Sequence, residues 1–302
     1  MTGAGKTQIS RMSRGLDHIV HAVRDLDAAA EFYRRAGFTV GARNRHAWGT
    51  HNYIVQFPGV FIELITIGEP ELIRAGGPGT FSFGTFTRDF LAREQGLAML
   101  VLEGKGAADD VEAFRAADIG NFKPFNFERE ARRPDGTPVK VGFSLVFAAD
   151  EKAPDIGYFT CQQHHPENFW NPAFQMHSNG AVGIDGVILV AANPQDHRHF
   201  VGAFSGVNDV VSSASGISAM TPRGEIQVMN PSAYRTYAGT HPPDLARGAH
   251  LAAIRFAVRD KTKAMSGLKE AGIAAVERNG NVVVAPDAAF GATLIFESPK
   301  QG

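Results

Sequence analysis

Residues 16–37 read LDHIVHAVRDLDAAAEFYRRAG, and this stretch determines how the rest of the chain is interpreted. Its first part, residues 16–23, is a largely apolar run of strand length. Asp25 then stands at a helix N-cap position, an amphipathic segment follows, and Gly37 is a typical helix terminator. The stretch therefore predicts a strand that is followed directly by a helix.

Three β-rich runs follow this helix, near residues 38–43, 51–57 and 60–67. The last two are separated by Pro58-Gly59, which is a turn signal. Together with the preceding strand and helix, these runs predict one βαβββ unit.

The same order of elements recurs three more times along the chain. Each later unit begins with an apolar strand and continues with a helix that ends at a glycine. The four predicted units span residues 16–67, 97–163, 184–231 and 251–298. The units share this pattern but little residue identity.

Two connections, residues 68–95 and 164–180, lie between the predicted units, and the second is rich in Phe, Trp and His. We expect a domain boundary near the end of the second connection, because two units precede it and two follow. The predicted organisation is a disordered tail at 1–14, an N-terminal domain at 15–180 and a C-terminal domain at 181–302.

The composition indicates a soluble protein that acts on small molecules. Lys and Arg total 30 against 31 for Asp and Glu, so no excess charge exists to hold nucleic acid or an anionic membrane. The longest apolar runs are far shorter than a membrane span, and the lone Cys161 cannot form an internal disulfide. We therefore expect a cytoplasmic location. A homodimer is compatible with four units in one chain but is not required by them.

Four short motifs in the first unit carry a family resemblance: LDHIVHAV at 16–23, DLDA at 25–28, WGTHN at 48–52 and FIEL at 61–64. On these residues the chain resembles the vicinal-oxygen-chelate superfamily and, within it, the glyoxalase-like branch. The resemblance implies an α+β fold in which four βαβββ units pair into two half-barrels of the glyoxalase/bleomycin-resistance/dihydroxybiphenyl-dioxygenase type. It also implies a divalent metal on the inner face of a half-barrel, with substrate oxygens completing the coordination.

His18 and Glu63 are the metal ligands that the resemblance implies, at facing positions of the first and fourth strands of the unit. Strand alternation places each of them in a row of apolar side chains, where a lone polar group needs a partner. An imidazole and a carboxylate with open positions suit Zn, Ni, Mn or Fe(II). A buried hydrogen bond between the two side chains would satisfy both without a metal, and this alternative stays open.

A third ligand is expected from the second unit, and His164 is the best candidate there. First-strand alignment places Met99, Gly186 and Ala253 opposite His18, so the other units do not repeat this histidine. Taken alone, His164 is also typical of a surface or interface histidine. A structural zinc site that includes His164 and Cys161 is disfavoured, because one thiolate is few for such a site.

His51 is the predicted acid/base residue, because it starts the third strand after the Trp48-Gly49-Thr50 turn and an imidazole titrates near neutral pH; a substrate contact is an alternative role. It could instead be a further ligand, or cap the preceding turn by hydrogen bonds. His21 lies on the face of its strand opposite His18, so we expect it to contact the helix layer and assign it no catalytic role. The predicted substrate contacts are Trp48, Asn52, Gln162 and Phe159.

Three functions are consistent with these features. The leading one is a divalent-metal-dependent enzyme of glyoxalase type, a lyase or isomerase acting on a small oxygenated metabolite. The second is a non-catalytic small-molecule-binding or resistance protein of the same fold. The third is an extradiol-type dioxygenase that uses iron. Two-domain members of that class keep their ligands in the second half, and the missing first-strand histidines there count against it.

Overall fold

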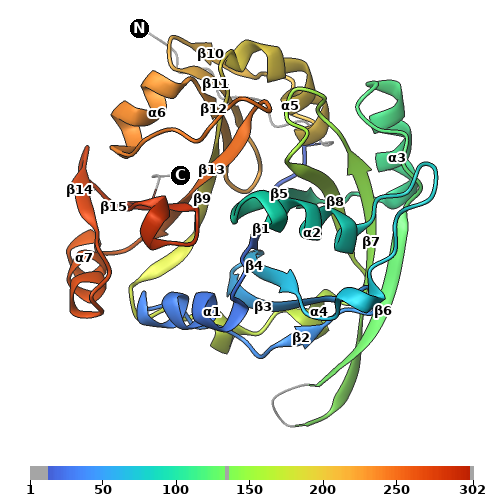
Figure 1. The fold of residues 1–302 in the computed structure, drawn as a ribbon, viewed down its shortest axis with the longest axis horizontal. Coiled ribbons are helices and arrows are strands. Elements are labelled where there is room, and N and C mark those ends of the chain that lie inside the picture. Colours follow the sequence, from blue (N-terminus) through green and yellow to red (C-terminus); the bar gives the residue numbers. More distant parts are fainter. Residues whose placement is uncertain (1–12, 133–135, 300–302) are drawn as a thin grey trace, which may run out of the picture.

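The computed structural model describes residues 13–132 and 136–299 (Figure 1). Of the predicted N-terminal tail, residues 1–12 lie outside the described part. Ser13 and Arg14 are buried, and Arg14 Nη2 lies 2.6 Å from Asp110 Oδ1. The packed chain therefore includes the last two residues of the predicted tail.

The first sheet contains eight strands in the order β2-β3-β4-β1-β5-β8-β7-β6. β1 lies parallel to β4, β5 lies parallel to β8, and β1 pairs with β5 in antiparallel orientation at the centre. The first strands of two units thus join the units into one sheet. Its strands are β1 (Leu16–Ala22), β2 (Asn44–Arg45), β3 (Thr50–Phe57), β4 (Val60–Ile67), β5 (Gly96–Glu103), β6 (Phe125–Arg132), β7 (Pro138–Ala148) and β8 (Gly157–Gln163).

The second sheet repeats this plan in the order β10-β11-β12-β9-β13-β16-β15-β14, with β9 and β13 as the central antiparallel pair. The predicted fold class, an α+β protein of four βαβββ units in two half-barrels, is confirmed. The strands are β9 (Ala181–Val190), β10 (Val211–Ser213), β11 (Gly216–Met220), β12 (Glu225–Met229), β13 (His250–Val258), β14 (Val276–Arg278), β15 (Asn281–Val284) and β16 (Thr293–Glu297).

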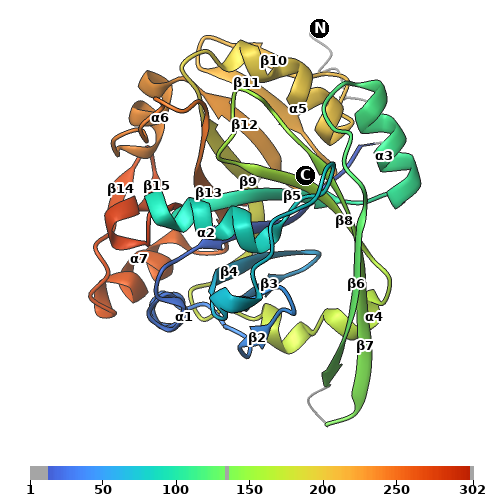
Figure 2. The same ribbon diagram turned by 45° about the vertical axis from the view of Figure 1, so that its right-hand side comes forward.

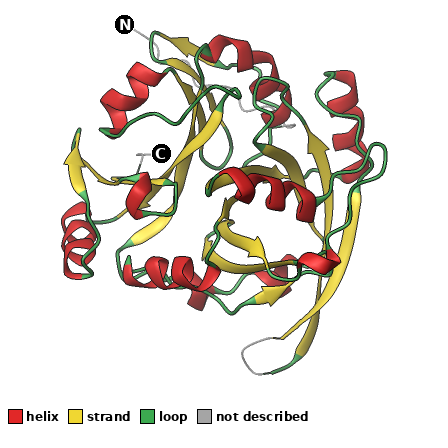
Figure 3. Cartoon of the chain, in the orientation of Figure 1, coloured by secondary structure: helices red, strands yellow, loops and turns green. Residues whose placement is uncertain are grey.

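The helices lie around the two sheets (Figure 3). The described α-helices are α1 (Leu26–Arg35), α2 (Phe83–Arg93), α3 (Ala107–Ala116), α4 (Pro166–Phe169), α5 (Arg198–Ser205), α6 (Pro231–Ala238) and α7 (Lys261–Glu270). The 3₁₀ turns are Pro70–Leu72, Pro172–Gln175, Pro194–His197 and Pro286–Ala288. None of the described helices is long and apolar enough to cross a membrane.

The predicted cap of α1 is confirmed, because Asp25 accepts a hydrogen bond from the backbone of Ala28; Asp260 caps α7 in the same way, accepting from Thr262 and Lys263. Gly206 ends α5 in the left-handed region, with φ of 68°.

Two details of the secondary structure predicted for residues 16–95 are wrong. The run at 38–43 is not a strand, and β2 is reduced to Asn44–Arg45. The first connection also contains α2, which is capped by Ser82 and buries Phe90. The Gly and Pro residues of that connection directed the prediction toward a loop, although the helix begins only after them.

A shared core holds the two sheets together. The ring of Phe38, just after α1, lies 5.0 Å from that of Phe256 on β13 and 6.0 Å from that of Phe296 on β16. On another side of the contact, Phe114 of α3 lies 5.8 Å from Phe204 of α5. Both halves therefore bury apolar surface against each other.

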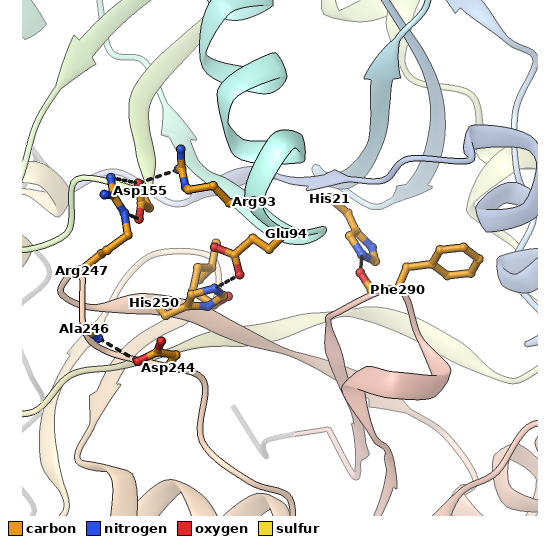
Figure 4. A network of polar contacts seen from close by, with 10 residues as sticks. His21, Arg93, Glu94, Asp155, Asp244, Ala246, Arg247, His250 and Phe290 are labelled. Carbon is orange, nitrogen blue, oxygen red and sulfur yellow. Dashed lines mark hydrogen bonds and ion pairs between the residues drawn. The ribbon is translucent and has the colours of Figure 1, made fainter.

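Polar contacts reinforce this contact between the halves (Figure 4). Asp155 binds Arg93 of α2 at 2.7 Å and Arg247 at 2.6 Å, and the two guanidinium groups hold the pKa of its carboxyl below the usual value. Beside it, His250 Nε2 lies 2.8 Å from Glu94 Oε2.

His21 of β1 links the halves in a fully buried position (Figure 4). Its Nε2–H donates to the carbonyl of Phe290, and its Nδ1 accepts from the hydroxyl of Tyr33 on α1, both at 3.0 Å. The expected contact with the helix layer is thus confirmed. Burial, partly offset by the Phe290 carbonyl, lowers the pKa of His21 to about 4.

This pKa makes folding stability depend on pH. Between about pH 6.5 and about pH 4 the unfolded state binds the proton that the native state excludes, so stability is full above this window and falls as the pH drops through it. The expected loss is about 3 kcal/mol, at about 1.4 kcal/mol per pH unit. Urea unfolding across the window should show this slope. A His21→Gln variant should be less stable at neutral pH and lack that part of the slope; an equal slope in both proteins would contradict the assignment.

Candidate functional site

A pocket opens on the inner face of the first sheet, between strands of both units. It contains a cavity of about 60 Å³, and most of its wall is aromatic or aliphatic. A wider groove of about 670 Å³ adjoins it and shares the side chains of Ile54, Arg129 and Phe169. Apart from Cys161, the ionisable and amide side chains that line the inner pocket are His18, His46, Asn52, Glu63 and Arg129.

His18 is fixed in one orientation by its neighbours. Its Nδ1–H donates to Asp17 Oδ1 at 2.6 Å, and Asp17 Oδ2 accepts from Gln163 at 3.1 Å. The imidazole stacks on Phe61, with ring centres 4.3 Å apart. Because Nδ1 is bound to Asp17, Nε2 is the ring nitrogen left facing Glu63 at the pocket.

Glu63 approaches His18 Nε2 from β4, which lies parallel to β1. Its Oε2 is 3.9 Å from His18 Nε2, which is too long for a hydrogen bond. Its Oε1 accepts from Asn52 Nδ2 at 2.5 Å. The described structure therefore does not contain the direct His–Glu hydrogen bond that would have satisfied both groups.

These residues fit a divalent metal. Two ligand bonds of about 2.1 Å can span the 3.9 Å between His18 Nε2 and Glu63 Oε2. A histidine whose other nitrogen donates to a carboxylate, as His18 donates to Asp17, is the usual arrangement behind a metal-binding imidazole.

His46 is a pocket residue that the sequence analysis did not single out. Its ring stacks on Trp48 at 4.5 Å, its Nδ1 lies 2.8 Å from Thr50 Oγ1, and its Nε2 lies 4.0 Å from Glu63 Oε1. Burial lowers its pKa, Glu63 opposes this, and Arg129 adds to it. The imidazole is thus neutral near neutral pH. The available signal was the presence of two histidines on either side of Trp48, of which only the second was considered.

The predicted substrate contacts divide into two groups. Trp48, Asn52 and Phe159 line the pocket, and the indole N–H of Trp48 is buried without a hydrogen-bond acceptor. Gln162 does not line it, since its side-chain oxygen accepts from the backbone of Ala107 at the start of α3.

His51 and His164 are placed away from the pocket as the structure describes it. His51 lies on the other face of β3 from Asn52, with its Nδ1 3.0 Å from Arg43 and its Nε2 3.2 Å from Glu69. His164 Nε2 lies 2.7 Å from Ser144 Oγ. The structure thus brings together His18 and Glu63 but neither of these two histidines with them.

The strand register shows what the second unit offers in place of ligands. His18 pairs with Phe61 two residues before Glu63, and Met99 pairs with Gly157 two residues before Phe159. Phe159 therefore stands in the second unit where Glu63 stands in the first.

Cys161 lies close to Asp17 and His18, with one potential ligand atom of each within 4.8 Å of the others. Burial raises the pKa of its thiol well above the usual value, and the negative charges of Asp17 and Glu63 raise it further. Asp17 is already bound to His18 through a hydrogen bond. We therefore interpret this cluster as support for His18, with Cys161 as a neutral thiol.

In the second sheet, a glutamine that binds a guanidinium stands at the register position of Glu63. Gln227 pairs with Ile188 in the register that corresponds to Glu63, and it accepts from Arg255 at 3.0 Å. Arg255 also binds Glu225 and Glu297, each at 2.7 Å, and is itself buried. In this half the positive charge beside the carboxylates is thus supplied by a side chain, that of Arg255.

Comparisons with known proteins were made on sequence and on structure. The model of the glyoxalase-like domain matches residues 16–203. No curated protein matches the chain. A hypothetical protein from Staphylococcus aureus is similar in structure, with a TM-score of 0.66 and 13% identity over 95% of this chain and 100% of that one.

Two further solved structures are similar. A mutant of 4-hydroxymandelate synthase from Streptomyces coelicolor has a TM-score of 0.57 and 10% identity, covering 96% of this chain and 94% of that one. A xylose isomerase-like TIM barrel/4-hydroxyphenylpyruvate dioxygenase fusion protein has a TM-score of 0.53 and 13% identity, covering 100% of this chain and 52% of that one. At these identities the likeness concerns the fold alone.

The neutral state of Cys161 predicts that the folded protein is inert toward thiol reagents. At neutral pH, Ellman's reagent should leave the native chain unmodified and should titrate about one thiol per chain in guanidinium chloride. A Ser213→Cys variant, with its thiol on the exposed β10, should react rapidly and serves as the control. Rapid, stoichiometric reaction of the folded parent would contradict the interpretation of the cluster.

Proposed function

Because the chain belongs to the glyoxalase-like domain family, we propose that its first sheet forms a divalent-metal-dependent enzyme of lyase or isomerase type. Its substrate would be a small oxygenated metabolite. The observation that carries this proposal is the free Nε2 of His18, which Asp17 orients and which Glu63 faces at 3.9 Å.

His18 and Glu63 would hold Zn, Ni, Mn or Fe(II) in this proposal, and both belong to the unit that carries the family motifs. When bound, such a metal supplies a Lewis acid that polarises a carbonyl or stabilises developing negative charge on a substrate oxygen. Asn52 fixes Glu63 by its hydrogen bond, and the aromatic wall limits the access of water to the reacting oxygen.

The proton transfer first predicted for His51 is assigned to His46 in this proposal. His46 lines the pocket, and burial keeps its imidazole neutral and ready to accept a proton. Its Nδ1 is held by Thr50, and its Nε2, 3.4 Å from Asn52 Nδ2, faces Glu63, so Nε2 is the nitrogen that would take the proton. His51 would then serve to hold the strand end through Glu69.

A binding protein without catalysis is the second candidate function, and one observation favours it. The second unit presents Met99 and Phe159 at the positions that correspond to His18 and Glu63, so it contributes apolar surface there. A binding pocket needs such walls and no complete ligand set. The dioxygenase alternative receives fold-level support only, from similarity to the 4-hydroxyphenylpyruvate dioxygenase fusion protein.

Metal content tests the proposal directly. The parent protein, purified without chelators or a His-tag, should contain about one divalent transition metal per chain by mass spectrometry. His18→Ala and Glu63→Ala should each lose it, because each removes one of two protein ligands. His164→Ala should lose metal only if His164 leaves Ser144 to become a third ligand.

His51→Ala and His46→Gln are the matched controls and should retain the metal, since the proposal gives neither residue a ligand role. A parent that takes up no metal, even after refilling with Ni, Zn, Mn and Fe(II), would overturn the metalloenzyme and leave the binding protein. Oxygen uptake by the iron-loaded parent with a catechol would favour the dioxygenase.

A further inference from the structure

Arg129 occupies the junction between the pocket and the outer groove. It lies on β6, which forms a long hairpin with β7 that extends beyond the rest of the sheet (Figure 2). Its side chain lines both cavities together with Phe169, whereas Phe127 of the same strand face lines only the inner one. The guanidinium therefore lies where the groove and the pocket meet.

The guanidinium of Arg129 has no hydrogen-bond or ion-pair partner within the described ranges. Burial lowers its pKa, with Glu63 opposing the effect from across the pocket, so the charge is partly removed from water. Glu130 and Glu167, the acidic residues of the groove, are exposed to solvent and form no ion pair with it. An unpaired cation among phenylalanines costs stability that a bound anion would restore.

A second hydrogen-bond donor without an acceptor lines the same pocket. It is the buried indole N–H of Trp48, whose ring lies 5.0 Å from that of Phe127, a neighbour of Arg129 on β6. Two unsatisfied donors in one pocket call for a ligand that brings acceptor oxygens. Most of the pocket wall is aromatic or aliphatic, so the same ligand needs an apolar body.

We propose that Arg129 forms an anion-binding subsite where the pocket meets the groove, and that the substrate is a small organic anion with an apolar body. The anionic group, a carboxylate or a phosphate ester, binds the planar fork of the guanidinium, and the body lies among the phenylalanines. The reacting oxygen then faces His18 and Glu63. This substrate class rests on the proposed function, because it takes the pocket as the place of reaction.

Calorimetric titration with three probes tests the subsite: phenylacetate, phenyl phosphate and the neutral phenylacetamide. The parent should bind at least one of the two anions at least tenfold more tightly than the amide, and the anion that binds identifies the group. Arg129→Gln should weaken that binding at least tenfold. The Arg129→Lys variant keeps the charge but not the fork, so its affinity for the anion should lie between those of the parent and Arg129→Gln.

Lys140→Gln is the matched control, because it removes a positive charge that pairs with Glu128 on the exposed face of the same hairpin. It should leave the affinity for the anion unchanged. Arg129→Gln should also melt no lower than the parent, since the lost cation is unpaired; a clear fall in melting temperature would indicate a structural role and overturn the subsite.

The His18→Ala variant separates this proposal from that of the metal site. Anion binding that survives in His18→Ala but not in Arg129→Gln supports the subsite, whatever the metal analysis gives. Binding lost in His18→Ala but retained in Arg129→Gln would overturn the subsite and leave the metal site standing. Failure of both anions to bind the parent would also overturn it.

Discussion

The antiparallel pairing of first strands is the interaction on which the rest of the molecule depends. β1 pairs with β5 and β9 with β13, and each pairing joins two βαβββ units into one continuous sheet. A central strand of such a sheet is covered on both faces, and all seven residues of β1 are buried. Every polar side chain on it must therefore find a partner, which is why Asp17, His18 and His21 are all held by named groups.

Much of the fold could be predicted from the sequence, because strand and helix signals recur locally in each unit. Caps such as Asp25 and terminators such as Gly206 act within a few residues, so reading them needs no tertiary information. α2 and α6 lie outside the repeated units and were missed. The shared core was also beyond prediction, since the contact of Phe38 with Phe256 joins residues far apart in the chain.

The candidate site was predictable only in part. Strand alternation placed His18 and Glu63 each in an apolar row, the family resemblance implied that they face each other, and the structure brings them within 3.9 Å. His46 depends on the path of a turn, and Arg129 on the register of a hairpin that folds over the pocket, neither of which is local information. His51 and Asn52 are consecutive on β3, so strand alternation places them on opposite faces, and of the two only Asn52 lines the pocket.

The buried Arg255 has a consequence for how the two halves depend on their surroundings. Its charge is covalently part of the chain, so the network with Glu225 and Glu297 is complete as soon as the second half folds. Nothing in that network has to be acquired from the cell, and chelators or metal starvation have nothing there to remove. If the first sheet carries an exchangeable cation, a shortage of that cation would inactivate the first half. The second half would stay folded and would continue to support it.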